Sequence, residues 1–224
     1  MRRSQLDTII DETRSIMARH GQILPPYALW TPAEWRARAL ETRLMRERGL
    51  GWNVATFKAD AFAESGIVVF TTRMGDHRDL AAGRGKLYGE KIFVCRDGQR
   101  VPYHYHRVKT EDVVNRGGGS FVIDLLQVDE GGQPTDLPFE LDRDGIRVTV
   151  PARASLSLAP GEGLTLDPLI AHAFRAEGGD VVCGEVSLAN DDAADNYFLE
   201  PLPDQAITED APARHCIVAD YSSF

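Results

Sequence analysis

The chain has 224 residues, of which 43% are hydrophobic, and a formal net charge of -9 at pH 7. This length suffices to bury the core of one domain. The negative charge argues against a nucleic-acid partner, because phosphate binding requires clustered lysine and arginine side chains.

The cysteines and the apolar stretches bear on the compartment. Three cysteines, Cys95, Cys183 and Cys216, are too few and too scattered for a disulfide framework or a cysteine-built zinc site. We expect reduced thiols in a cytoplasmic protein. The N-terminus shows no signal-peptide pattern, and no stretch approaches the ~20 apolar residues of a membrane span, so we expect no membrane partner.

The first fifty residues have a helical pattern. Ser4 is predicted to cap a first helix that carries one apolar face. A second helix is predicted from Thr31, followed by proline and paired with Glu34 in a capping box, as far as Gly49.

From about residue 65 the pattern changes to short β-rich runs separated by Gly, Pro or Asp. The predicted strands are Ile67–Thr72, Lys91–Cys95, Ser120–Val128, Ile146–Val150, Ser155–Leu158, Leu164–Leu166 and Val181–Leu188. Many short strands at close spacing are typical of a closed or double-sheet β architecture. We therefore predict a single, mainly β domain over residues 1–224, with residues 1–50 packed on it as a helical extension.

Four residues are predicted to bind one divalent metal. His104 and His106 are two residues apart, so in a strand both imidazoles point to the same face. Glu111 follows near the start of the next strand and can supply an oxygen ligand, and His172 is the candidate for the fourth ligand. An isolated pair of this kind is more often structural than metal-binding, but here three of the six histidines of the chain fall in two β-rich segments.

This segment matches the first cupin motif, G-x5-H-x-H-x4-E-x6-G. The matching positions are Gly98, His104, His106, Glu111 and Gly118. The second cupin motif is matched only loosely, by Pro168 and His172, because Ile170 stands where a glycine is usual. The absence of this glycine affects the expected geometry of the turn before His172 more than the expectation that His172 is a ligand.

Several short strings are similar to the D-lyxose isomerase family. They are Leu24-Pro-Pro-Tyr, Phe70-Thr-Thr-Arg-Met-Gly, Tyr88-Gly-Glu-Lys-Ile, Lys109-Thr-Glu-Asp, Asn115-Arg-Gly-Gly-Gly and Gly184-Glu-Val-Ser. The resemblance implies a jelly-roll cupin β-barrel, dependence on Mn²⁺ and a homodimer. It also implies an aldose–ketose isomerase that interconverts D-lyxose and D-xylulose, or D-mannose and D-fructose, through an enediolate. The ligand chemistry alone also suits Zn²⁺, Co²⁺ or Fe²⁺.

The isomerase hypothesis requires groups that move protons. Glu185 is the leading candidate, because an acid in an otherwise apolar strand is expected to face a polar cavity; the alternative is a surface acid at the strand end. Lys109 is the candidate donor at the sugar oxygens, and a solvated turn lysine is the alternative. Lys91 and Asp195 are weaker candidates for sugar binding. Two other functions stay open: an Fe-dependent cupin oxygenase, and a sugar-binding cupin without catalysis.

Overall fold

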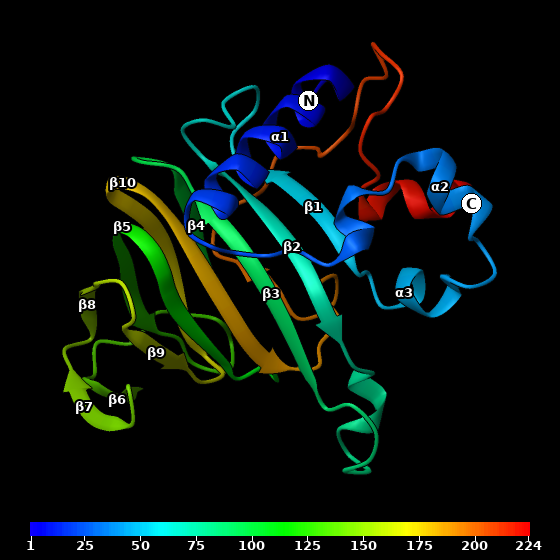
Figure 1. Ribbon diagram of the computed structural model, residues 1–224. Coiled ribbons are helices and arrows are strands. Elements are labelled where there is room, and N and C mark those ends of the chain that lie inside the picture. The colour runs from blue at the N-terminus through cyan, green and yellow to red at the C-terminus, as the bar shows by residue number, and fades with distance from the viewer.

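The computed structural model describes residues 1–224, and its main feature is one eleven-stranded sheet whose strands pair antiparallel (Figure 1). The strands are β1 (Gly51–Thr56), β2 (Gly66–Met74), β3 (Tyr88–Cys95), β4 (Arg100–Tyr105), β5 (Glu111–Gln127), β6 (Phe139–Arg143), β7 (Ile146–Val150), β8 (Arg153–Leu158), β9 (Gly163–Leu166), β10 (Ile170–Leu188) and β11 (Tyr197–Phe198). The mainly β prediction is therefore confirmed.

Two long strands fold the sheet on itself. The first part of β5 pairs with β9 and its last part with β8, while β10 pairs first with β4 and then with β3. Glycines allow the bends: Gly118 has φ 111°, and a Cβ atom there would lie 1.9 Å from the Asp180 carbonyl oxygen. The glycine run that follows Asn115 is thus a bend inside one strand rather than a link between two strands.

The main apolar core lies between the two halves of the folded sheet. Phe121 is fully buried, and its ring centroid lies 5.8 Å from that of Phe93 and 5.1 Å from that of Phe174. Aliphatic side chains of β5, β9 and β10 complete this cluster. The core fills one part of the barrel and leaves the other part to polar side chains.

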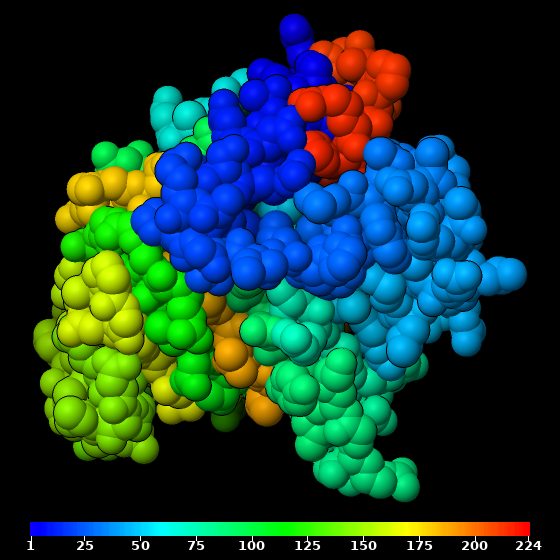
Figure 2. Space-filling view, viewed as in Figure 1, coloured from blue at the N-terminus to red at the C-terminus, as the bar shows by residue number.

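A second apolar layer joins the N-terminal helix to the outer face of the sheet. The helix α1 (Arg3–Arg19) buries Leu6, Ile10 and Met17 in a cluster that includes Phe70 of β2 and Val182 of β10. The helix crosses the sheet in Figure 1, and in Figure 2 the C-terminal segment lies beside it. No helix of the structure has the length and apolar character needed to span a membrane.

The C-terminal segment is tied to this helix by charge. The buried guanidinium of Arg3 contacts Glu209 at 2.7 Å and Asp220 at 2.6 Å. The segment ends in the 3-10 helix η3 (Val218–Ser223). The remaining short helices are η1 (Pro26–Leu29), α2 (Pro32–Ala37), α3 (Arg43–Glu47) and η2 (His77–Asp79).

The helical predictions were partly wrong. The first helix begins at Arg3, and Ser4 lies inside its first turn, where the Ser4 side chain donates to Asp210 at 2.7 Å. The capping box of Thr31 and Glu34 is confirmed, but the second helix is split into α2 and α3. Leu40, in the break, is exposed, so no packing surface supports a continuous helix there.

The strand predictions fell short in a different way. Strands β5 and β10 are much longer than predicted. Glycine usually marks the end of a strand in sequence, but here the glycines lie at bends within each strand. Strands β1, β6 and β11 were missed, and β4 was expected only from the spacing of His104 and His106. Strand β6 alternates apolar and charged residues over only five positions, and β11 has two residues, so neither carries a strong periodic signal.

Phe121 provides a test of the core. We expect Phe121→Ala to lower the free energy of unfolding by about 3–5 kcal/mol, because it opens a cavity among buried aromatic rings. Urea unfolding followed by tryptophan fluorescence measures this change. The matched control is Ile146→Ala at a 66% exposed position, where we expect a change of no more than about 0.5 kcal/mol. Equal effects at the two positions would contradict this core.

Candidate metal centre

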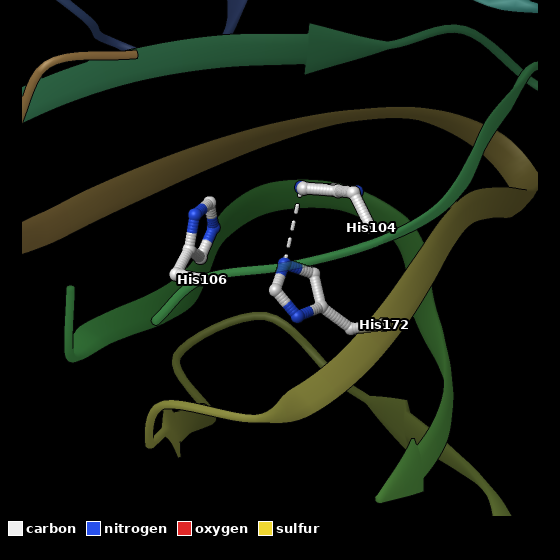
Figure 3. Close-up of side chains that lie close together, drawn as sticks. All are labelled: His104, His106 and His172. Atoms are coloured by element: carbon white, nitrogen blue, oxygen red, sulfur yellow. Dashed lines mark hydrogen bonds between the residues drawn. The ribbon is translucent and has the colours of Figure 1, made fainter. Parts of the chain in front are cut away.

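Two neighbouring strands bring three histidines together. His104 lies in β4 and His106 directly follows it, while His172 lies in β10 opposite His104 in the strand register. One ring nitrogen from each of the three lies within 4.8 Å of the others. Figure 3 shows the three imidazoles pointing toward a common centre.

Glu111, the first residue of β5, completes the group. Its Oε1 atom lies 3.2 Å from Nε2 of His172 and 3.6 Å from Nε2 of His106. The structure thus brings together all four residues that the sequence proposed as metal ligands. All four side chains are nearly or fully buried.

Hydrogen bonds fix the protonation pattern of the three rings. Each Nδ1 atom lies close to a backbone carbonyl oxygen: His104 to Pro102 at 3.0 Å, His106 to Asp195 at 2.5 Å, and His172 to Ile170 at 2.9 Å. A carbonyl oxygen only accepts, so each Nδ1 must carry the proton and donate. In a neutral ring the Nε2 atom then presents a lone pair.

These lone pairs face one another. The Nε2 atoms of His104 and His172 are 3.1 Å apart, the contact drawn as a dashed line in Figure 3. With both Nδ1 atoms protonated, neither neutral ring has a proton to place between them. The Nε2 atom of His106 is buried and has no hydrogen-bond partner. A cation between the three nitrogens removes the repulsion and satisfies the orphaned atom, so the residues fit a metal ion.

The electrostatics keep the rings of His104 and His172 neutral. Burial, together with the neighbouring imidazoles of His172 and His106, lowers the pKa of His104 well below its usual value. Burial also lowers the pKa of His172, although Glu111 opposes the shift. Neutral imidazole is the form that binds metal.

Glu111 stays ionised. Burial alone would raise the pKa of Glu111, but the Lys109 ammonium and the neighbouring imidazoles of His106 and His172 outweigh it and hold the pKa well below the usual range. The carboxylate is therefore available as an oxygen ligand near neutral pH. Lys109 contacts the other oxygen, Oε2.

A row of alternating charges leads away from Glu111. Lys109 Nζ lies 3.4 Å from Oε1 of Glu185, and Lys91 Nζ lies 3.2 Å from the same oxygen. Lys91 also contacts Asp192 at 2.9 Å. Burial would lower the pKa of both lysines, but the surrounding carboxylates outweigh it and raise the pKa values, so both are protonated.

The proposed proton-transfer residues both belong to this row of charges. Glu185 and Lys109 are buried side by side, and Lys109 also contacts Glu111, so the surface alternatives for both residues are wrong. Lys91 lies on the far side of Glu185. Asp195 faces the backbone of the turn from Arg107 to Lys109, to which its carboxylate accepts three hydrogen bonds.

No pattern in the sequence pointed to Phe198. Its ring stacks on His104 with centroids 5.1 Å apart and an interplanar angle of 24°, and Phe57 packs against it at 5.5 Å. Phe198 lies opposite His104 in the pairing of β11 with β4. It gives the cluster an apolar wall.

The turn before His172 shows how the departure from the second motif is accommodated. Leu169 takes a φ of 67°, a backbone region that favours glycine. Its N–H donates to the His106 carbonyl oxygen at 2.8 Å, which links the turn to the other histidine segment. The strained residue therefore precedes Ile170, the position where the motif usually has glycine.

Comparison with known proteins gives a consistent result. A family model described as D-lyxose isomerase matches residues 1–221. The chain is 39% identical to a D-lyxose/D-mannose isomerase of Escherichia coli O157:H7 and 38% identical to one of Serratia proteamaculans, over its whole length and at least 99% of theirs.

Solved structures show the same fold at low sequence identity. A ligand-free L-ribose isomerase of Cellulomonas parahominis superposes with a TM-score of 0.62 at 16% identity, covering 93% of this chain and 98% of that chain. The L-ribose isomerase of Geodermatophilus obscurus gives 0.54 at 17% identity, covering 90% and 94%. The fold that these neighbours share with the chain confirms the predicted fold class.

The metal centre can be tested by ligand removal. We expect Mn²⁺ at 100 times its Kd to stabilise the protein by about 2.7 kcal/mol, and His106→Ala to lose both this stabilisation and the bound metal. Thermal unfolding with and without Mn²⁺, together with metal analysis, measures the effect. His77→Ala, at an exposed position in η2, is the control and should retain the stabilisation. Full metal occupancy in His106→Ala would contradict the ligand set.

Proposed function

Because the chain belongs to the D-lyxose isomerase family, we propose that this sugar isomerase interconverts D-lyxose and D-xylulose, and also D-mannose and D-fructose. We propose that it depends on one divalent metal ion. The observation that carries the proposal is the convergence of three unprotonated imidazole nitrogens and one carboxylate beside a buried acid and a buried lysine.

His104, His106, Glu111 and His172 are the residues that would hold the ion. Three imidazoles and one carboxylate suit Mn²⁺, and Zn²⁺, Co²⁺ and Fe²⁺ share the preference. The resemblance to the family favours Mn²⁺. When bound, such an ion would supply Lewis-acid polarisation of the carbonyl oxygen of an open-chain sugar.

Glu185 is the proposed proton carrier between the two carbons. Its carboxylate would take the proton from C2 of the aldose and return it to C1, with an enediolate of the sugar between the two steps. Its position between Lys109 and Lys91 supports this role, because two ammonium groups hold the carboxylate in place beside the cluster.

Lys109 is the proposed donor at the sugar oxygens. Its ammonium lies between Glu111 and Glu185, so it can hydrogen-bond an oxygen placed between the metal ligands and the base. The C1 oxygen gains a proton and the C2 hydroxyl loses one, so the total number of protons is unchanged. Lys91, held by Asp192, is the proposed donor to a sugar hydroxyl further along the chain.

The proposed substrate is a free monosaccharide.

The family resemblance also underlies the proposal that the protein is a homodimer. Sedimentation of the purified protein tests the dimer independently of activity.

Activity gives the first test of the proposal. After EDTA treatment we expect no turnover of D-lyxose, and after Mn²⁺ is restored we expect D-xylulose to form. Ketose is measured by a coupled reductase assay. Failure to convert either D-lyxose or D-mannose with any of the four dications would overturn the proposed function.

The role of Glu185 is tested separately. We expect Glu185→Gln to lower kcat by about 10²- to 10⁴-fold while the metal content stays unchanged, because the amide cannot carry the proton. Glu177→Gln, an exposed residue of the same strand, is the matched control and should keep its activity. Unaltered turnover in Glu185→Gln would remove Glu185 from the mechanism.

A further inference from the structure

We infer that Asp195 is a positioning residue that holds His106 and Lys109 in their working places. The inference rests on the proposed function, because it concerns the metal centre and its neighbouring lysine. It assigns Asp195 a role other than direct sugar binding.

The side chain of Asp195 organises the turn between β4 and β5. Its Oδ1 atom accepts from the N–H of Arg107 at 2.8 Å, and its Oδ2 atom accepts from the N–H groups of Val108 at 3.3 Å and Lys109 at 3.0 Å. Three successive N–H groups directed at one anion form a backbone nest. Asp195 is buried, so its charge is satisfied by these donors rather than by water.

The backbone of Asp195 acts on the metal ligand that precedes this turn. Its carbonyl oxygen accepts from Nδ1 of His106 at 2.5 Å, although the two residues are 89 positions apart in the sequence. This bond fixes the tautomer and turns the unpartnered Nε2 atom toward the cluster. One residue therefore fixes His106 through its carbonyl and Lys109 through its carboxylate.

His106 differs from the other two histidines in the acceptor of its Nδ1–H group. His104 and His172 each donate to the carbonyl two residues earlier in their own strand, Pro102 and Ile170. Their orientation is set as soon as their strand forms. The orientation of His106 instead depends on where the loop after β10 lies.

The carboxylate of Asp195 is a buried anchor of that loop. Residues 191–194, which precede it, are all exposed. The N–H of Asp195 donates to the Asp191 carbonyl oxygen within the same loop, so it does not attach the loop to the barrel. Removing the carboxylate would leave three N–H donors of the turn without a partner. It would also loosen the segment that carries the acceptor of His106, which would then be held only by the contact of Asp192 with Lys91 and by the pairing of β11 with β4.

The test is Mn²⁺ binding by the metal-free protein, measured from the electron paramagnetic resonance signal of free Mn²⁺. We expect Asp195→Ala to weaken Mn²⁺ binding by about 10- to 100-fold, the range typical for partners that orient a metal ligand. Asp195→Asn keeps one acceptor oxygen, so we expect a smaller loss of about tenfold. Asp191→Asn, an exposed residue of the same loop, is the control and should bind Mn²⁺ as the wild type does.

Circular dichroism of each metal-free variant separates this role from a general loss of folding. A folded Asp195→Ala variant that binds Mn²⁺ within threefold of the wild type would overturn the inference. If Asp195→Ala does not fold, the Asn variant decides by the same threefold criterion. A wild-type protein that binds no Mn²⁺ would overturn the metal centre as well, whereas equal binding by wild type and variants would overturn only the role of Asp195.

Discussion

Three Nδ1–H donations to backbone carbonyls are the constraint on which the rest of the site depends. They leave the Nε2 lone pairs of His104, His106 and His172 directed at one another within a group of nearly or fully buried side chains. Such an arrangement is unfavourable without a cation, so the fold holds a repulsive set of donors in place. The pairing of β4 with β10 provides this, since it fixes His104 opposite His172.

The buried charges beside the histidines also depend on one another for compensation. Removing an ion pair from water costs several kcal/mol, and a row of alternating sign recovers this cost only while every member stays paired. Glu111, Lys109, Glu185 and Lys91 form such a row, and Asp192 ends it at the surface. A hydrophobic set of similar volume would serve stability as well. A role in the reaction therefore explains this row of charges better than a contribution to folding stability does.

The sequence predicted the grouping of the four proposed metal ligands more completely than the fold around them. The spacing of His104 and His106 determines a shared face in any strand, and the motif adds Glu111, so these relations are local. The contacts of Asp195 and Phe198 join segments far apart in the chain, and β11 is too short to show a period. The split of the second helix was likewise set by the surface available for packing, which no local pattern reports.

Strand β10 carries His172 near its start and Glu185 near its end, with the bend at Gly178 and Gly179 between them. A proposed metal ligand and the proposed base are thus mounted on one continuous piece of backbone, and the curvature of that piece sets their separation. Substitutions at the bend, remote from the reacting atoms, would respace these two groups. Evolution can in this way adjust the reach of the site to another sugar by reshaping a strand, while every residue that performs chemistry stays the same.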